Sequence, residues 1–422
     1  MQARVRDTTA LASGSVLSGL LAYVFFALST RALGAAGAAP VSVLWTYWSF
    51  AAAALTFPLQ HWITRSVAAH DGEAAVHHAL PRVAMLVVVA SGAAGLLAWM
   101  ARDALFHRDD AWFPLLVGCV TLGSGLIGVV RGGLSARHRF RGVASVLVAE
   151  NASRCVAAAV LMIAHVRASL GYGICLAAGS LVGLLWPSSF RFATHRGRSA
   201  AESSFRFLGG AAGGQLIGQA VLTGGPVLLA LSGGTAVQVT ALFAALALFR
   251  APYMVAVAVV STLTGRLTTL LVQDNHAALR RVRVSVLAGA AAAASMAGGL
   301  GAVAGPGLLR LIFGNEVRLD WFLSMLVAIG SAFALANLVM TIMIMAQGGS
   351  GKLARAWVVG VLGGVLVWVL SAQEPLMRTC WAFLAAEAVA FAALTVEEVR
   401  GSARHSSRDA RNRGATPLYE AS

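Results

Sequence analysis

The sequence predicts an all-α membrane protein that crosses the bilayer about twelve times, arranged as two pseudo-symmetric six-helix bundles. Three observations predict this class: the composition, the recurrence of long apolar stretches, and the alternation of basic residues between them. Of the 422 residues, 58% are hydrophobic and 12% are charged, and the mean hydropathy is +0.76. A soluble domain carries about 25% charged residues. This chain therefore has too few charges to cover a surface in contact with water.

Twelve apolar stretches lie between charged or turn-forming segments. A hydrocarbon core of about 30 Å requires about 20 helical residues, and the stretches have close to that length. Each is predicted to be a helix, because backbone polar groups in lipid must be hydrogen-bonded within the chain and no β-barrel alternation is present. The first six cover residues 10–30, 41–63, 83–100, 113–130, 143–165 and 171–190, and the second six cover residues 208–231, 237–263, 284–303, 321–346, 357–372 and 379–396.

The formal net charge of +15 is distributed unevenly between alternate connections. Short cytoplasmic loops carry the excess of Lys and Arg. With the amino terminus inside, 23 of the 32 basic residues fall on the cytoplasmic side and seven on the outer side. The sequence therefore predicts two cytoplasmic termini, an amino-terminal bundle (1–206), a carboxyl-terminal bundle (207–397), and a basic cytoplasmic tail (398–422) that we expect to be disordered.

Several classes of function are excluded by the same pattern. Nucleic-acid binding is not predicted, because no soluble domain is available to present a basic, aromatic-containing face. The four cysteines lie within apolar stretches and lack metal-ligand spacing. The chain also lacks a Walker loop, a dinucleotide-binding glycine pattern and a zinc-protease helix motif. We therefore expect no cofactor, no metal and no enzymatic activity, which leaves transport as the default function.

Charged side chains inside the apolar stretches are the strongest pointers to function. Each costs about 2.5–3.5 kcal/mol at the centre of a membrane helix, so it must face the protein interior. The fifth stretch contains Glu150, Asn151 and Arg154, which helical spacing places on one face. They form either a self-neutralising structural group or part of the lining of a substrate path.

The eighth stretch contains Arg250, with no acidic residue in the same helix. Its planar guanidinium suits phosphate oxygens, so it is predicted to contact an anionic substrate or to pair with Glu387 of the twelfth stretch. Glu387 is alternatively a candidate site for proton or sodium coupling. Asn337, in the tenth stretch, is expected to join helices rather than to bind a ligand.

Two breaks in the predicted helices are candidate hinges. Gly224, Gly225 and Pro226 interrupt the seventh stretch at depth, and Pro252 follows Arg250 by two residues in the eighth. Proline removes a backbone donor and kinks a helix, while paired glycines loosen it. Such breaks are typical of hinge or cavity-lining segments in transporters.

From about residue 8 to 397, the sequence resembles the polysaccharide flippases of the MOP exporter superfamily, which are relatives of the O-antigen and teichoic-acid repeat-unit translocases. The order and spacing of short motifs carry this resemblance. The motifs are Ala12-Ser13-Gly14-Ser15, Arg31-Ala32-Leu33-Gly34, Arg131-Gly132-Gly133-Leu134 before the basic loop through Phe140, the polar patch from Glu150 to Arg154, and Leu311-Ile312-Phe313-Gly314.

The resemblance implies two six-helix bundles around a central, often cationic cavity. Such a protein moves an isoprenoid-pyrophosphate-linked saccharide from the inner to the outer leaflet of the cytoplasmic membrane by alternating access. Arg154 and Arg250 would then be cavity cations. The implied partners are the lipid-linked saccharide, membrane lipids and, among proteins, a polysaccharide polymerase or glycosyltransferases.

Two rival functions stay open at this stage. One is an ion-coupled exporter of small molecules or drugs with twelve spans, although the loop of residues 64–81 lacks the motif typical of the major facilitator class. The other is a non-transporting membrane scaffold. Accumulation of inner-leaflet lipid-linked sugar in a strain without its own flippase, relieved by this chain, would distinguish the flippase from both.

Overall fold

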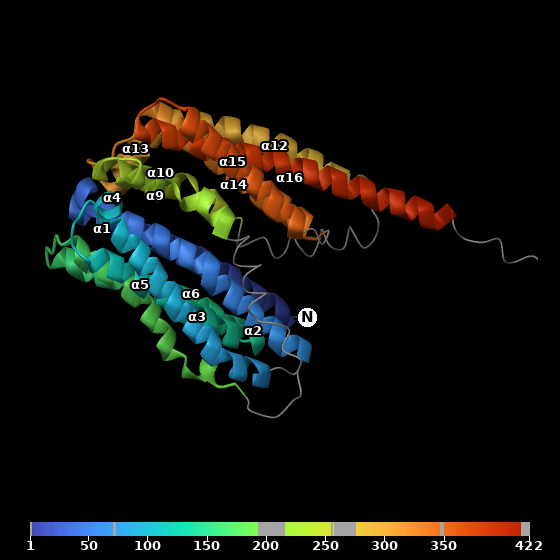
Figure 1. Ribbon diagram of the computed structural model, residues 1–422, viewed down its shortest axis with the longest axis horizontal. Coiled ribbons are helices and arrows are strands. Elements are labelled where there is room, and N and C mark those ends of the chain that lie inside the picture. The colour runs from blue at the N-terminus through green and yellow to red at the C-terminus, as the bar shows by residue number, and fades with distance from the viewer. Residues whose placement is uncertain are drawn as a thin grey trace, which may run out of the picture.

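The computed structural model describes residues 2–70, 73–192, 216–254, 256, 276–346 and 350–414, and every regular element within these ranges is a helix (Figure 1). Among these described residues, eight helices are long and apolar enough to span a membrane. Shorter apolar helices cover Ser169–Leu185 and Ala236–Phe249. The prediction of an all-α membrane protein is confirmed.

The amino-terminal half contains the six predicted spans in order. The first long helix, α1, contains two spans. They are separated by a break in the backbone at Gly34, where φ is 72° and ψ is 173°. The elements are α1 (Gln2–Ala51), the π-helical η1 (Ala52–Thr56), α2 (Phe57–His70), α3 (Glu73–Met100), α4 (Arg102–Phe106), α5 (Trp112–Ala136), α6 (Phe140–Ile163), α7 (Ser169–Ala178), and the 3-10 helices η2 (Gly179–Leu185) and η3 (Pro187–Phe190).

The break at Gly34 explains why one candidate span has 59 residues, Thr9–Val67. A straight helix of that length would be about 90 Å long, roughly three times the hydrocarbon core. The break therefore divides this segment into the first and second spans of the sequence prediction.

The carboxyl-terminal half repeats the pattern of long helices with short helices at their connections. Helical residues 216–223 precede α9, and residues 251–254 are helical after Arg250. The remaining elements are α9 (Gly225–Leu231), α10 (Ala236–Phe249), α12 (His276–Val303), α13 (Gly305–Phe313), α14 (Trp321–Ala346), α15 (Ser350–Leu370) and α16 (Pro375–Gly414).

The two halves contact one another at one end of the molecule and diverge toward the end that carries the amino terminus (Figure 1). We call these the joined end and the splayed end. At the joined end, α1 packs against α9, α10 and α13, and α4 packs against α9. The arginine distribution predicts that the joined end is the outer one.

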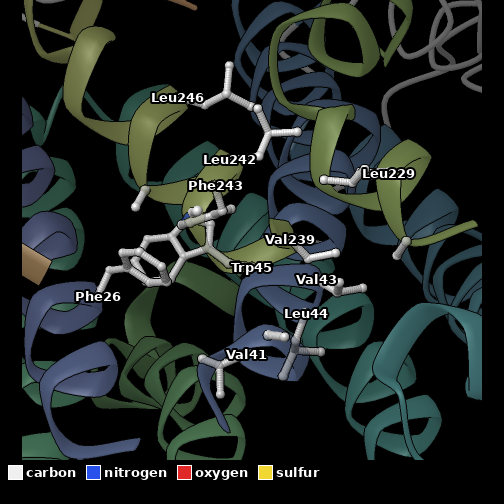
Figure 2. Close-up of a cluster of buried hydrophobic side chains, with 14 of the residues drawn as sticks. Phe26, Val41, Val43, Leu44, Trp45, Leu229, Val239, Leu242, Phe243 and Leu246 are labelled. Carbon is white, nitrogen blue, oxygen red and sulfur yellow. The ribbon is translucent and has the colours of Figure 1, made fainter. Parts of the chain in front are cut away.

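A shared apolar core fills this junction, with side chains from both halves (Figure 2). The ring of Phe26 lies 4.4 Å from that of Phe243 and 5.4 Å from that of Phe313, measured between ring centroids. Trp45 completes the contact at 6.2 Å from Phe243. Burial of such large rings accounts for the close association of the halves at this end.

Only part of the predicted tail lies within the described residues. Helix α16 continues beyond its apolar part, which ends at Arg400, as far as Gly414. Ion pairs near the start of this extension fix the helix to its neighbours: Arg283 Nη1 lies 3.1 Å from Glu398 Oε2, and Arg355 Nη2 lies 3.3 Å from Glu397 Oε1. Residues 415–422, and the predicted boundary between residues 206 and 207, lie outside the described residues.

Candidate functional site

Each half contains a buried polar cluster built from an arginine, a glutamate and an asparagine. We call Glu150, Asn151 and Arg154 the N-terminal cluster. All three lie on α6 and are buried, with Arg154 at 0% exposure. Spacing of three and four residues brings them onto one helix face, as the sequence predicts.

The polar atoms of the N-terminal cluster are bonded to one another and to neighbouring helices. Arg154 Nη2 donates to Glu150 Oε1 at 2.7 Å, Nη1 donates to Asn151 Oδ1 at 3.1 Å, and Nε donates to the Leu176 carbonyl at 3.0 Å. Asn151 Nδ2 donates to Ser18 Oγ at 2.8 Å. All three guanidinium nitrogens therefore have acceptors.

Close contacts fix the Arg154 side chain in this position. The ring centroid of Trp48 lies 4.6 Å from its guanidinium carbon, in a cation–π arrangement. On another side the backbone of Gly179 is so near that a Cβ there would lie 2.4 Å from Arg154 Nε. These contacts join Arg154 to Glu150 and to α1 and α7. Whether the cluster also lines a substrate path stays a prediction.

The second cluster, which we call the C-terminal cluster, consists of Arg250, Asn337 and Glu387. Glu387 and Asn337 are both at 0% exposure. Asn337 Nδ2 donates to the Glu387 carboxylate Oε2 at 2.8 Å and to its backbone carbonyl at 2.9 Å, which joins α14 to α16. The expected role of Asn337 between helices is therefore seen. Glu387 Oε1 and Asn337 Oδ1 have no hydrogen-bond partner.

Arg250 lies at a break in its span. Helix α10 ends at Phe249, and Arg250 is its C-cap residue. The chain is helical again at residues 251–254, which include Pro252. The guanidinium lies 5.7 Å from the ring centroid of Phe383. Arg250 is only 9% exposed. Its Nε and Nη2 are buried and have no hydrogen-bond partners.

The predicted pairing of Arg250 with Glu387 is not seen as a direct ion pair between these two described residues. Arg250 Nε and Nη2 and Glu387 Oε1 all lack hydrogen-bond partners. Tyr23, from the other half, also lies near the guanidinium, and its hydroxyl donates to the Ala247 carbonyl three residues before Arg250. The C-terminal cluster thus lies close to the other half. It also contains buried donors and acceptors without hydrogen-bond partners.

Unpaired buried polar groups are costly, and each one in a folded protein calls for an explanation. An anion with two oxygens would satisfy the free Arg250 nitrogens in the bidentate geometry that guanidinium groups favour. A bound cation or a proton would similarly satisfy the free Glu387 oxygen. The cluster has the chemistry of a binding site rather than of a finished structural network.

The helix breaks occur at the predicted hinge positions. Gly224 interrupts the seventh span, and α9 begins at Gly225 with Pro226 in its first turn. A Cβ on Gly224 would lie 2.3 Å from the Ala220 carbonyl oxygen, so only glycine fits there without a shift. Whether these breaks act as hinges stays a prediction.

Two residues that the sequence interpretation did not assign lie near these clusters but outside them. Arg131 was counted with an inner loop, but it lies inside α5 with its guanidinium 5.3 Å from the Phe57 ring centroid and within the field of Glu150. Its Nε has no partner. Tyr23 carries no signal of its own, because a single tyrosine in an apolar helix is ordinary.

Among the described residues, no group of three or more His, Cys, Asp or Glu side chains is placed to hold a metal ion. The described cysteines are free. Two polar clusters inside a pair of helical bundles are instead the arrangement found in membrane transporters, whose sites form between facing helices near the repeat interface.

The comparisons with known proteins identify the family. The model of the polysaccharide biosynthesis protein family matches residues 4–272, more than half of the chain. The chain belongs to this family. No curated protein sequence matches the chain significantly.

Solved structures of the MOP superfamily share the fold. An inward-facing multidrug-resistance MATE transporter matches with a TM-score of 0.70 and 12% identity, over 92% of this chain and 95% of that chain. An outward-facing MATE transporter matches with a TM-score of 0.63 and 12% identity, over 95% and 96%. The lipid II flippase MurJ in an inward closed conformation matches with a TM-score of 0.62 and 11% identity, over 94% and 90%. The chain therefore has the fold of these MOP superfamily structures.

Proposed function

We propose that this transporter is a flippase that carries an isoprenoid-pyrophosphate-linked saccharide across the cytoplasmic membrane, for the synthesis of a cell-surface polysaccharide. The observation that carries the proposal is the buried Arg250 guanidinium, which has two unpartnered nitrogens at a helix break between the halves. The family match to polysaccharide biosynthesis proteins supports the saccharide class, and the fold shared with MurJ supports a lipid-linked substrate.

Flipping requires a polar route through the membrane. Transfer of one unpaired saccharide hydroxyl from water to an apolar medium costs about 2–7 kcal/mol of free energy. A headgroup with many hydroxyls therefore needs a path lined by polar groups. Two bundles that rock about a midplane site provide one by alternating access. The lipid tail meanwhile stays in the bilayer.

The described conformation suits the loading step of this cycle. The halves are joined at the predicted outer end and diverge at the predicted cytoplasmic end (Figure 1). The higher TM-score to an inward-facing relative, 0.70 against 0.63 for an outward-facing one, supports this assignment. A substrate made in the inner leaflet would then approach from the splayed end.

Arg250 would bind the pyrophosphate, and it needs to break no direct ion pair to do so. Arg154, Glu150 and Asn151 would support the wall of the path, because all guanidinium nitrogens of Arg154 are already bonded. Arg131, whose Nε is free, would add a second cation in the amino-terminal half.

The test is reconstitution into vesicles with a fluorescent isoprenoid-pyrophosphate-linked oligosaccharide. One charge-assisted hydrogen bond contributes about 1.5–3 kcal/mol, so Arg250→Ala should slow flipping roughly 10- to 100-fold. Arg250→Lys should retain part of the activity. Arg310→Ala is the matched control, because Arg310 is exposed and bonds only within α13, to the Pro306 carbonyl at 3.2 Å.

The outcomes separate two claims. Full flipping by Arg250→Ala would show that the anion contact is wrong while the substrate class stands. Absence of flipping by the unmodified protein, with the vesicles shown to be intact, would show that the substrate class itself is wrong.

A second candidate function is ion-coupled export of a small molecule. The free Oε1 of Glu387, buried at 0% exposure, favours it, because a coupling ion or proton would bind there. The test is export of a fluorescent cationic drug from cells in which the protein moves no lipid-linked saccharide. Export by the unmodified protein, and its loss in Glu387→Gln, would support this candidate over the flippase.

The proposal also includes the cellular setting. We place the protein in the cytoplasmic (inner) membrane with both termini inside, where it would work beside a polysaccharide polymerase or glycosyltransferases. A reporter that is active only in the cytoplasm, fused after residue 422, should be active. An active periplasmic reporter at the same position would reverse the topology.

A further inference from the structure

Two of the short motifs singled out in the sequence meet at the joined end, one from each half. The break at Gly34 starts a new helical segment in α1, and the first N–H groups of such a segment have no acceptor within the helix. Ala35 N–H donates to Glu316 Oε2 of the other half at 2.9 Å. A carboxylate is the favoured cap at this position, because a helix N-terminus carries partial positive charge.

The reverse contact runs from the amino-terminal half to the carboxyl-terminal half. Arg31 Nε donates to the Ile312 carbonyl at 2.9 Å, and Arg31 Nη2 donates to the Leu311 carbonyl. Both carbonyls belong to the last turn of α13, where backbone acceptors lack partners and the dipole favours a cation. Each half thus caps a helix end of the other.

Glycines make this close approach possible. Gly34 has a φ of +72°, which an L side chain rarely adopts, and a Cβ there would lie 2.5 Å from Glu316 Oε2. Gly314 has a φ of +105° and turns the chain between the capped end of α13 and Glu316. Any side chain at residue 34 would therefore push the carboxylate away from Ala35.

Two further hydrogen bonds join the halves at the same end. Thr240 Oγ1 donates to the Ala35 carbonyl at 2.7 Å. The His107 ring Nε2 lies 2.8 Å from the Gly234 carbonyl oxygen. Below them lies the aromatic contact of Phe26 with Phe243.

We propose that Arg31, Gly34 and Glu316 form a latch that holds the joined end shut and that opens as a unit when the transporter turns to its outward-open state. Arg31 and Glu316 are exposed, so water replaces each cap when it breaks, and the latch is reversible. The aromatic contact beneath supplies the bulk of the association, and the two caps set its register. The proposal rests on the transporter class and not on the identity of the substrate.

The test measures opening directly, without a substrate. Spin labels at Ala168→Cys and Gln373→Cys report the separation of the halves at the joined end, and labels at Arg82→Cys and Lys352→Cys report it at the splayed end. The exposed native Cys119 is first replaced by serine. Pulsed electron paramagnetic resonance on the full chain in lipid nanodiscs then gives the populations of closed and open distances.

We expect Glu316→Ala, Arg31→Ala and Gly34→Ala each to raise the ratio of open to closed populations at the joined end. Loss of one helix cap should raise the ratio of open to closed populations about fivefold. The distance at the splayed end should shorten in the same molecules. Glu316→Gln keeps an acceptor of the same size without the charge, so its effect should be smaller than that of Glu316→Ala.

Matched controls lie in the same region. Glu374→Ala removes an exposed acid that caps no helix of the other half, and Arg318→Ala removes an arginine that bonds within its own loop, to the Asn315 carbonyl at 3.0 Å. Gly307→Ala adds a Cβ in α13 with no atom within 4 Å. These three should leave both distances unchanged.

Unchanged populations in Glu316→Ala and Arg31→Ala, in protein that elutes as a folded monodisperse species, would overturn the latch. An equal shift in the controls would overturn it as well. Should Gly34→Ala fail to fold, Glu316→Ala and Arg31→Ala still decide the outcome, because both remove a cap and leave the backbone at Gly34 unchanged. None of these results depends on whether the substrate is a lipid-linked saccharide.

Discussion

The two polar clusters contain the same three residue types and differ in how completely they are bonded. In the N-terminal cluster, every guanidinium nitrogen of Arg154 has an acceptor. In the C-terminal cluster, Arg250, Asn337 and Glu387 all retain buried atoms without partners. A network that satisfies itself holds helices together, whereas a network with spare donors and acceptors is available to a ligand. A buried charge in a membrane helix therefore does not by itself mark a binding site.

The largest expected contrast is between the two glutamates. Glu150→Gln leaves Arg154 charged and buried without its carboxylate, which costs about 3–5 kcal/mol when a buried pair is broken. Glu387→Gln keeps the bond to Asn337 and breaks no direct ion pair, so the free energy of unfolding should fall by less than about 1.5 kcal/mol. Thermal unfolding of both variants in the same detergent measures the difference. Equal losses would mean that the clusters do not differ in the way described.

A smaller effect is expected from the backbone that encloses Arg154. Gly179→Ala places a Cβ 2.4 Å from Arg154 Nε and 2.6 Å from its Cγ, so the side chain must move. Forcing an extra carbon into a filled interior costs about 1–3 kcal/mol. Gly299→Ala is the control, because no atom lies within 4 Å of a Cβ there. A melting temperature for Gly179→Ala equal to that of the control would contradict the close contact.

The smallest expected effect tests the bond from the N-terminal cluster to the first span. Ser18→Ala removes the acceptor of Asn151 Nδ2, at 2.8 Å, and the donor to the Leu147 carbonyl, at 3.0 Å. Loss of a hydrogen bond of this kind costs about 0.5–1.5 kcal/mol. Ser145→Ala, on the exposed side of α6, is the control. A transport defect in Ser18→Ala larger than its loss of stability would indicate that this cluster does more than hold helices.

Much of the fold follows from the sequence alone. The apolar stretches predict the order of the spans, and the Gly224 to Pro226 break and the break at Arg250 appear where glycine and proline place them. These features are local, because hydrophobic length and backbone propensity act within one helix. The ion pairs of Glu397 and Glu398 with α15 and α12 were not predicted, since they join distant parts of the chain.

The candidate site was predicted only in part. Helical spacing brings Glu150, Asn151 and Arg154 together, but it does not show that the Leu176 carbonyl takes the third guanidinium donor. Nor does spacing show that Asn337 of α14 reaches Glu387 of α16 and leaves Arg250 without a direct carboxylate partner. Arg131 was assigned to a loop, whereas α5 continues to Ala136 and contains this residue.

The sequence by itself determined the all-α class of fold and which charges must turn inward, because both follow from the cost of placing a polar group in lipid. The tertiary structure alone decided which of the inward charges is satisfied and which is free. It also decided that the motif at Arg31 to Gly34 meets the one at Leu311 to Gly314. Those outcomes depend on distances between different helices, which hydrophobic periodicity within one helix does not encode.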